Sequence, residues 1–375
     1  MKTITILLLH MQHGGIEKQT ITLANELCKK YKVNIITTYS MLASPAYPVD
    51  ERINIKYLMD TKPNKDEFKA AVRSKNPFAI LKEGIKAVSI LRKKKSLMIK
   101  EIKKLDCDYV LSTRIEYADM LSAYAPEGVV TVTQEHLHDD SPEYVERVKR
   151  SFRNLDYLVV LCEGSEKNHS GWLSDNKKIK LVRIPNILED IPEKTAEIKG
   201  NNIVSVGRLH PVKDFPTLIE VFSKVQKRVP DATLTIVGGG DEHKKLSDLA
   251  ESLGVSDKVK ITGMVSKEDV LRYMLDSDIY VMTSLTECFP MVLLEASSVG
   301  LPLVSFDVPV GPCAIIENGK NGYLIDDKKI DEMADKVVEM LTDREKLSEM
   351  GKNAKKMAES YLPENVMPLW FDLFR

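Results

Sequence analysis

The sequence lacks the features that mark several large classes of protein. Only five cysteines occur in 375 residues, and none forms a C-x-x-C pair, which indicates neither a disulfide framework nor a structural zinc site and fits a reducing cytoplasm. No uncharged apolar run approaches the ~20 residues that cross a bilayer. The apolar stretch ending at Leu9 is followed by His10, Gln12 and Glu17 rather than by a signal-peptide cleavage site. We therefore expect a cytoplasmic protein with no transmembrane helix.

Net charge is also nearly absent, at −1, but the charges are unevenly distributed. Fourteen basic residues and only four acids lie between Lys62 and Lys104, interleaved with apolar residues. This pattern favours a basic amphipathic helix pair on an anionic membrane surface, at the inner face of the cell membrane, through Lys82–Lys104. An ordinary solvated helix face is the alternative. Nucleic acid is not expected as a partner, because no aromatic stacking pattern accompanies the charges.

Apolar strands alternate with helical patterns along the chain, which predicts an α/β protein with parallel sheets covered by helices. The predicted strands are residues 3–9, 33–37, 109–112, 129–133, 157–161, 203–206, 233–237, 259–261, 279–282, 303–306 and a short one near Tyr323. Prolines and acids at residues 185–200 interrupt the alternation. We therefore predict two Rossmann-like doubly wound domains, residues 1–186 and 201–360. A linker at residues 187–200 would join them, and a C-terminal helix at residues 361–375 would pack back on the N-terminal domain.

Ligands of doubly wound sheets bind at the carboxyl ends of strands, so the loops that follow strands are where functional residues are expected. In the N-terminal half, Gly14 and Gly15 precede a helix and would let backbone amides approach a phosphate. A tight turn is the alternative, since the spacing is not G-x-G-x-x-G. His136 and His138 follow the strand at residues 129–133. One of them could bridge donor and acceptor, whereas a metal site would need a third ligand from the acids that follow.

Two loops of the C-terminal half carry charged groups. Arg208 and Lys213, five residues apart after the strand at residues 203–206, could straddle a diphosphate. Glu287 lies in the loop after the strand at residues 279–282, and Glu295 lies on the following apolar helix, where ribose hydroxyls would satisfy its carboxylate. Salt bridges within the protein are the alternative for all four. The start of this helix, with Pro290 at its first position, could bind phosphate. It comprises Phe289, Pro290, Met291 and Val292.

In combination these motifs resemble the GT-B retaining glycosyltransferases of family four. The matching motifs are Gly14-Gly15, His136, Gly207-Arg208-Leu209 with Lys213, and Glu287 with Glu295. Residues 306–312 and 321–325 match later segments of capsule, teichoic-acid and lipid-linked-glycan transferases, so the resemblance covers nearly the whole chain. It implies two domains facing across a cleft. It also implies retaining transfer of a hexosyl or N-acetylhexosaminyl group from a nucleotide diphosphate sugar, UDP rather than GDP, to a glycan or lipid-linked acceptor in cell-surface polysaccharide synthesis.

The resemblance also implies roles for single residues on the donor side. Arg208 and Lys213 would bind the donor diphosphate and stabilise it as the leaving group, so neither a metal nor a cofactor is expected. Glu295 would bind the ribose hydroxyls, and Glu287 would bind the transferred sugar. The backbone near Met264 resembles the loop that binds the base.

In the N-terminal half, the resemblance implies that Gly15 contacts the donor phosphates. It likewise makes His136, but not His138, the active-site histidine near the transferred sugar and the acceptor. One departure from the family is Cys288, which stands where glycine usually follows the first glutamate. Sugar contacts made by that backbone are therefore expected to differ.

Three other functions share some of these features. A sugar-nucleotide epimerase of similar architecture would release no nucleotide in response to an acceptor. A nicotinamide oxidoreductase would also use Rossmann-like domains, but Thr37-Thr38 stands where an acid would bind the ribose. A noncatalytic membrane-surface module would bind anionic vesicles through Lys82–Lys104 without binding sugar nucleotides.

Overall fold

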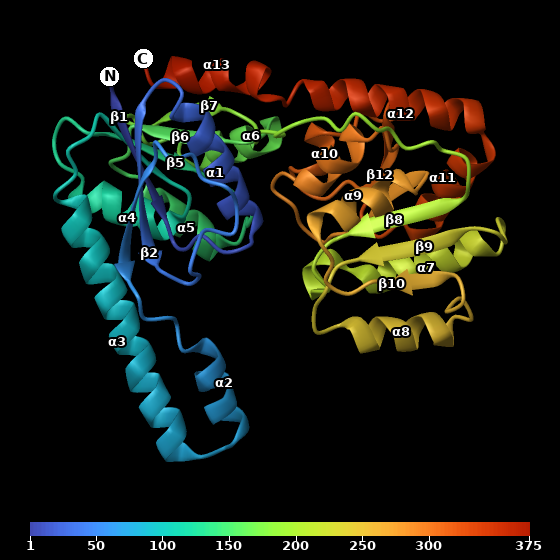
Figure 1. Cartoon of the computed structure of the whole chain (residues 1–375), viewed down its shortest axis with the longest axis horizontal. Helices are drawn as coiled ribbons and strands as arrows, with labels where there is room; N and C mark the ends of the chain where they lie inside the picture. The colour runs from blue at the N-terminus through green and yellow to red at the C-terminus, as the bar shows by residue number, and fades with distance from the viewer. The chain divides into compact units, whose positions relative to one another are not determined.

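The structure, a computed structural model, describes residues 1–375, and the chain divides into two compact units (Figure 1). Unit 1 consists of Met1–Val160, Asn168–Arg183 and Asp372–Arg375; unit 2 consists of Leu161–Lys167 and Ile184–Phe371. The observed division differs from the predicted one in two places. The short segment at residues 161–167 belongs to unit 2. The predicted C-terminal helix is divided: residues 361–371 belong to unit 2, and residues 372–375 belong to unit 1, where the Phe374 and Tyr109 ring centroids lie 4.9 Å apart.

Unit 1 contains a seven-stranded parallel sheet in the order β3-β2-β1-β4-β5-β6-β7. Its strands are β1 (Thr3–Leu8), β2 (Lys32–Tyr39), β3 (Asn54–Met59), β4 (Tyr109–Ser112), β5 (Val130–Gln134), β6 (Tyr157–Val160) and β7 (Lys180–Arg183). The helices around it are α1 (Gly15–Leu27), α4 (Ile115–Tyr124) and α5 (Pro142–Ser151), and α6 (Glu163–Trp172) begins in unit 2 and ends in unit 1. The prediction misses β3 and β7. Both are edge strands, whose partial exposure allows polar residues that weaken the apolar pattern.

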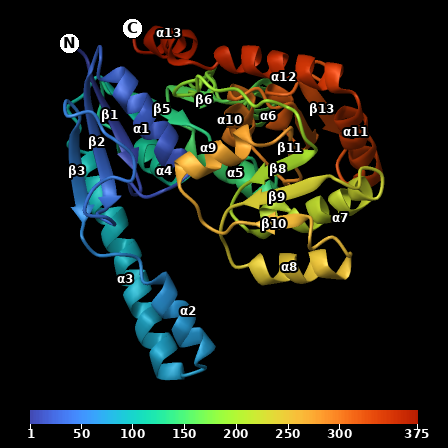
Figure 2. The same cartoon turned by 45° about the vertical axis from the view of Figure 1, so that its right-hand side comes forward.

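A helical hairpin of α2 (Lys65–Arg73) and α3 (Pro77–Ile102) extends away from the sheet of unit 1 (Figures 1 and 2). α3 begins at Pro77, and the Asn76 side chain caps it by accepting a hydrogen bond from the Phe78 amide at 3.0 Å. At the other end, Met98 and Ile102 are fully buried in the core of the unit. α3 is therefore anchored at its C-terminal end, while its N-terminal half projects into solvent beside α2.

Unit 2 contains a six-stranded parallel sheet in the order β10-β9-β8-β11-β12-β13. Its strands are β8 (Asn202–Val206), β9 (Thr233–Val237), β10 (Val259–Ile261), β11 (Ile279–Met282), β12 (Leu303–Phe306) and β13 (Gly322–Ile325). Its helices are α7 (Phe215–Gln226), α8 (His243–Ser252), α9 (Lys267–Leu275), α10 (Met291–Ser298), α11 (Ile330–Thr342), α12 (Arg344–Glu359) and α13 (Pro363–Leu373), with short 3-10 turns at Pro211–Lys213 and Pro312–Ala314. In both sheets the first and fourth strands are neighbours, and the chain leaves them in opposite directions, which is the doubly wound arrangement.

Two predicted boundaries need correction. The predicted linker at residues 187–200 is packed on unit 2, where Leu188 and Ala196 are buried and their amides donate hydrogen bonds to the carbonyls of Tyr361 and Val299, both at 2.8 Å. The predicted first helical residue, Pro290, instead precedes α10, because its backbone is extended (ψ 94°) and the helix begins at Met291.

Candidate functional site

The loops that follow β8 and β11 are neighbours in unit 2, because these two strands pair with each other. The Leu285 amide donates to the Val212 carbonyl at 2.9 Å, and the Thr283 hydroxyl donates to the Asp214 carbonyl at 3.0 Å. This is the point where the strand order of the sheet reverses, and ligands of doubly wound sheets bind at such a point. The topology therefore brings together Arg208 and Lys213 from one loop and Glu287 from the other.

Lys213 and Glu287 form an ion pair at this point. The Lys213 Nζ lies 2.5 Å from the Glu287 Oε1, and the two side chains are only 21% and 14% exposed. Arg208, at the start of the same loop, is exposed and makes no salt bridge within the chain. The loop thus holds one cation that is already neutralised and one that is open to an anion. Charge-assisted hydrogen bonds from both would suit a diphosphate.

Glu287 is held in place from behind by the segment after β12. Glu287 forms a parallel β-bridge with Val310, and a Cβ added to Gly311 would lie 2.9 Å from the Glu287 Cβ, so only glycine fits there. Val310 itself has φ 69°, the left-handed region that a β-branched residue rarely adopts. Such outliers persist only where the surrounding structure over-determines them. The backbone of Glu287 is therefore packed closely against Val310 and Gly311.

Glu295 lies on α10, one helix turn beyond the loop. The apolar sequence around it predicts a fully buried side chain. In the structure the Glu295 side chain is only partly buried. The phenol of Tyr280 is fully buried beneath the site, and burial, together with the charges of Glu287 and Glu295, raises its pKa. The Tyr280 hydroxyl donates to the Val206 carbonyl at 3.1 Å, directly before the Arg208 loop. Tyr280 thus lies beneath Glu287 and Glu295 and is hydrogen-bonded to the end of β8.

The residues before and at the start of α10 contribute mainly backbone. Phe289 is 7% exposed and packs edge-on against Tyr361, with ring centroids 5.6 Å apart. Pro290 is buried, whereas Met291 and Val292 are partly buried. No side chain caps α10, so the first amides of the helix have no side-chain acceptor. These amides are the groups at this end of the helix that an anion could use.

Three glycines after β9, Gly238–Gly240, form a platform that the prediction misses. A Cβ on Gly238 would lie 2.0 Å from the Gly207 carbonyl oxygen, and one on Gly239 would lie 3.2 Å from the Met264 amide. The backbones of three strand-end loops are therefore in direct contact. Met264 is 82% exposed beside this platform. The signal in the sequence is the glycine run directly after the predicted strand at residues 233–237.

Cys288 is buried and points away from solvent. Its Sγ lies 3.9 Å from the Ser165 Oγ, and its carbonyl accepts a weak hydrogen bond from the Cys162 thiol, with the sulfur 3.8 Å away. The side chain that replaces the family's usual glycine is thus accommodated in the core of unit 2. This packing fixes the peptide between Glu287 and Phe289.

In unit 1, His136 follows β5 and is fixed by its neighbour Glu135. The buried Glu135 carboxylate accepts hydrogen bonds from the amides of His136 and Leu137, at 3.1 and 3.0 Å, and from the Tyr144 hydroxyl at 2.8 Å. Burial raises the pKa of Glu135. Burial, with a smaller effect of the Arg114 charge, lowers the pKa of His136 to about 4. The imidazole is therefore neutral at pH 7, and its buried Nε2 has no hydrogen-bond partner.

Gly14 and Gly15 lie at the start of α1, beside a second charged cluster. A Cβ on Gly14 would meet the Glu17 Oε2 at 2.2 Å, so the glycine makes room for that carboxylate, whereas nothing lies within 4 Å of a Cβ on Gly15. Glu17 is 3% exposed and accepts a hydrogen bond from the Arg114 guanidinium at 2.9 Å. His10 Nδ1 lies 3.6 Å from the same carboxylate. Burial lowers the pKa of His10 more than the Glu17 charge raises it.

Arg114 is the candidate that the prediction misses in unit 1. It follows β4, and β4 pairs with β1, so Arg114 and the Gly14 loop lie at the strand-order reversal of unit 1. Its buried Nε has no hydrogen-bond partner. The signal in the sequence is an arginine directly after the predicted strand at residues 109–112. No group of three or more His, Cys, Asp or Glu side chains is arranged to hold a metal ion.

The predicted site residues therefore fall into two groups, one in each unit. Unit 2 brings together the Arg208 loop, the Glu287 loop and the start of α10. Unit 1 holds the Gly14 loop and His136, which follow different strands.

None of the helices combines the length and the apolar character that a membrane-spanning helix needs.

Comparison with known proteins agrees with this architecture. The chain superposes over its whole length on a solved structure of a Staphylococcus aureus TarM mutant in complex with fondaparinux, alpha-GlcNAc-glycerol and UDP. The TM-score is 0.78 at 16% sequence identity, and 100% of both chains is covered. The predicted fold class is therefore confirmed: the chain is an α/β protein of the GT-B fold.

The sequence comparisons match part of the chain to a protein family and nearly all of it to individual glycosyltransferases. Residues 187–357 match the family described as glycosyl transferases group 1. The chain is 28% identical over 365 residues to an uncharacterized glycosyltransferase of Haemophilus influenzae, covering 95% of both. It is 26% identical over 252 residues to the poly(ribitol-phosphate) alpha-N-acetylglucosaminyltransferase of S. aureus, covering 66% of this chain and 50% of that protein. The chain spans about two fifths to one half of several other curated relatives. The chain is thus similar, over residues 187–357, to the glycosyl transferases group 1 family.

Proposed function

We propose that the protein is a retaining glycosyltransferase that moves a hexosyl or N-acetylhexosaminyl group from a nucleotide diphosphate sugar to a glycan or lipid-linked acceptor. The observation that carries the proposal is the Lys213–Glu287 pair beside the exposed Arg208, at the strand-order reversal of unit 2. Cell-surface polysaccharide synthesis is the proposed process, and UDP is favoured over GDP. The process is supported by the similarity to the poly(ribitol-phosphate) alpha-N-acetylglucosaminyltransferase. The choice of UDP is supported by the UDP in the TarM complex.

On this proposal the donor binds along the strand-end loops of unit 2. Its diphosphate would accept hydrogen bonds from Arg208, Lys213 and the first amides of α10. Glu295 would accept hydrogen bonds from the ribose hydroxyls, and the transferred sugar would bind Glu287. The exposed Met264 and the backbone beside it would receive the base, because the close contact among Gly238–Gly240, Gly207 and Met264 brings these strand-end loops together at one edge of the sheet.

The proposed step breaks the bond between the anomeric carbon and the diphosphate oxygen and forms a bond from that carbon to the acceptor oxygen on the same face. The proton of the acceptor hydroxyl passes to the departing diphosphate. Arg208 and Lys213 would stabilise the charge that develops on the leaving group, a role that needs no metal ion. The neutral His136 would hydrogen-bond a sugar hydroxyl through Nε2, and Gly15 would let the backbone approach the phosphates.

The proposed acceptor is a glycan or lipid-linked glycan close to an anionic membrane surface. The exposed cations of Lys82–Lys104 would hold unit 1 there, at roughly 1 kcal/mol for each side chain near the lipid headgroups. This contact would place the protein at the inner face of the membrane reversibly.

Three measurements test the proposal. UDP and GDP sugars are screened for thermal stabilisation of the protein, and UDP sugars should raise the unfolding midpoint more. Product analysis by NMR should show the anomeric configuration of the donor retained, and EDTA should leave turnover unchanged. Inversion of configuration would contradict the proposed step, and acceptor-independent interconversion of the donor would favour an epimerase.

A further inference from the structure

The free surface of the α2–α3 hairpin is apolar at its far end. Phe78, Leu81, Ile85 and Val88 follow one another at spacings of three and four residues, so they share one face of α3. They are 84%, 63%, 64% and 48% exposed. Isolated exposed apolar residues are ordinary, but a contiguous stripe of large ones on a projecting helix marks a binding surface.

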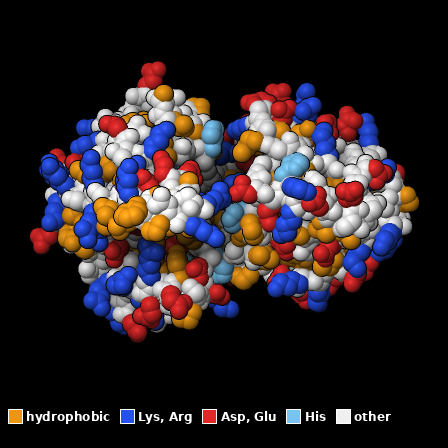
Figure 3. Space-filling model, turned by 90° about the horizontal axis from the view of Figure 1, so that it is seen from below, with side chains coloured by type: hydrophobic (Ala, Val, Ile, Leu, Met, Phe, Trp, Pro, Cys, Tyr) orange, Lys and Arg blue, Asp and Glu red, His pale blue; other side chains and the backbone are white.

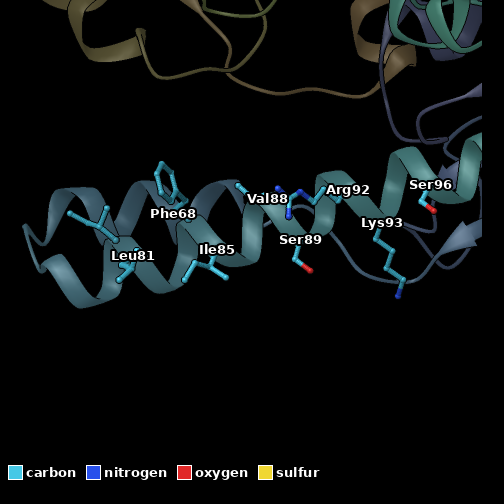
Figure 4. A pocket seen from close by; sticks show the side chains of 10 residues that line it. Phe68, Leu81, Ile85, Val88, Ser89, Arg92, Lys93 and Ser96 are labelled. Atoms are coloured by element: carbon cyan, nitrogen blue, oxygen red, sulfur yellow. The ribbon is translucent and has the colours of Figure 1, made fainter.

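A shallow groove of about 920 Å³ runs along this stripe, between α3 and the Phe68 side chain of α2. Figure 4 shows Leu81, Ile85, Ser89 and Lys93 pointing to the same side of α3, so the surface changes from apolar at the far end to cationic toward the sheet. Figure 3 shows hydrophobic side chains among Lys and Arg side chains over this part of unit 1, at the left of the view.

The charges around the stripe indicate what covers it. Nine Lys and Arg lie within Lys82–Lys104 against Glu83 and Glu101, and both of these acids have lysine partners, Lys86 at 3.9 Å and Lys56 at 2.5 Å. A second copy of this chain would bring the same cations to the contact and be repelled. An anionic lipid surface offers both an apolar interior for the stripe and negative headgroups for the cations.

Lys94 corrects the sequence interpretation of this segment. It is only 6% exposed and pairs with Glu116 of α4 at 2.5 Å. It is therefore part of the anchor that holds α3 on unit 1, and it is not available to lipid. The exposed cations nearest to it are Arg92, Lys93 and Lys95.

From these observations we propose that the far end of the α2–α3 hairpin inserts into an anionic bilayer as a wedge. The stripe of Phe78, Leu81, Ile85 and Val88 would enter the boundary between headgroups and acyl chains, and the cations toward the sheet would remain at the headgroups. The inference rests on the membrane-proximal acceptor of the proposed function and deepens it. A purely electrostatic contact is released by salt, whereas an inserted apolar stripe keeps part of its affinity at high salt.

The test is cosedimentation with phosphatidylglycerol-containing and pure phosphatidylcholine vesicles at low and high salt. Wild type should bind the anionic vesicles and keep a measurable part of that binding at high salt. Leu81→Gln with Ile85→Gln should lower partition by about 10-fold or more at both salt concentrations. Leu253→Gln, which changes an exposed leucine of unit 2, is the matched control and should bind as wild type does.

A second measurement reports insertion directly. The chain has two native tryptophans, so the emission of wild type is subtracted from that of a Phe78→Trp variant. The difference emission should shift to the blue on anionic vesicles and be quenched by lipids brominated on their acyl chains. Full release of wild type by salt, with unchanged binding of the glutamine variant, would overturn the wedge. So would self-association that the glutamine variant abolishes in the absence of vesicle binding. Wild type and all variants should be stabilised thermally by UDP. If UDP does not stabilise wild type, the proposed function is contradicted, whereas the wedge is tested by the vesicle measurements alone.

Discussion

The two units share one topology and differ in the chemistry at the same topological point. Both sheets have the order 3-2-1-4-5-6 by position in the chain, with a seventh strand in unit 1. At the reversal, unit 2 presents the exposed Arg208 beside the Lys213–Glu287 pair, whereas unit 1 presents the buried Glu17 held by Arg114. The comparison teaches that the sheet fixes where a site lies, and that the loops decide what the site binds.

The largest effect should come from the cations of unit 2. Arg208→Ala and Lys213→Ala should each lower transfer by about 10- to 1000-fold, because each removes a charged contact to the leaving diphosphate. Steady-state kinetics with a soluble acceptor measure the loss. Lys244→Ala, which removes an exposed lysine paired with Asp248, is the control and should leave turnover unchanged. Near-normal turnover in the two folded site variants would remove the diphosphate assignment.

In unit 1 the matching change should act first on stability. Arg114→Met would leave the buried carboxylate of Glu17 without its guanidinium partner, at a cost of about 1–3 kcal/mol in free energy of unfolding. Chemical denaturation measures the difference. Adding Glu17→Gln to Arg114→Met should recover part of the loss, and Lys149→Met, which breaks an exposed pair with Glu146, should cost less. Equal stability of wild type and Arg114→Met would contradict a stabilising role for the Arg114–Glu17 pair of unit 1.

The two glutamates of unit 2 should separate binding from turnover. Glu295→Gln should weaken UDP binding by about 10-fold, because ribose hydroxyls donate more strongly to a carboxylate than to an amide. Glu287→Gln should lower turnover more than UDP affinity. Calorimetry with UDP and kinetics with donor sugar distinguish them, with the exposed Glu268→Gln as the control. An unchanged UDP affinity in Glu295→Gln would contradict its proposed role.

The smallest effect concerns pH and His136. Its pKa is lowered to about 4 from 6.5, so between these values the unfolded chain takes up a proton that the folded chain does not. The stability of wild type should therefore fall as the pH drops through this window. His136→Gln should weaken that dependence in thermal unfolding followed from pH 7 to pH 4, whereas His138→Gln should retain it. Parallel curves for wild type and His136→Gln would show that the histidine does not titrate in this way.

The periodic parts of the chain could be predicted from the sequence, and the confirmed results are the GT-B fold and the resemblance to glycosyl transferases group 1. Buried strands such as β1 and β11 are short, mainly apolar runs rich in β-branched and aromatic residues, a length and composition that indicate strands. The edge strands β3 and β7 have one neighbour each and carry polar residues, which removes that signal. Helix starts were the other weak point: Pro290 is common at a first helical position, yet here it precedes the helix.

Contacts between distant segments could not be predicted. Arg208, Lys213 and Glu287 are recognisable by type and place, but nothing in their spacing shows that Lys213 and Glu287 pair with each other. Likewise Arg114 becomes notable only when β4 is seen to pair with β1. The burial of Lys94 depends on Glu116 of another helix. The roles of the site residues in catalysis stay predictions.

The ion pair of unit 2 has a consequence for the order of events during donor capture. Without donor, Lys213 is neutralised by Glu287, so at this point of the sheet the exposed Arg208 contributes the long-range attraction that an incoming dianion meets. We expect Arg208 to govern the association rate and its dependence on ionic strength. Lys213 must first separate from Glu287, and we expect it to govern the residence time of the bound nucleotide. Stopped-flow binding of a fluorescent nucleotide would resolve the fast encounter from the slower exchange of partners.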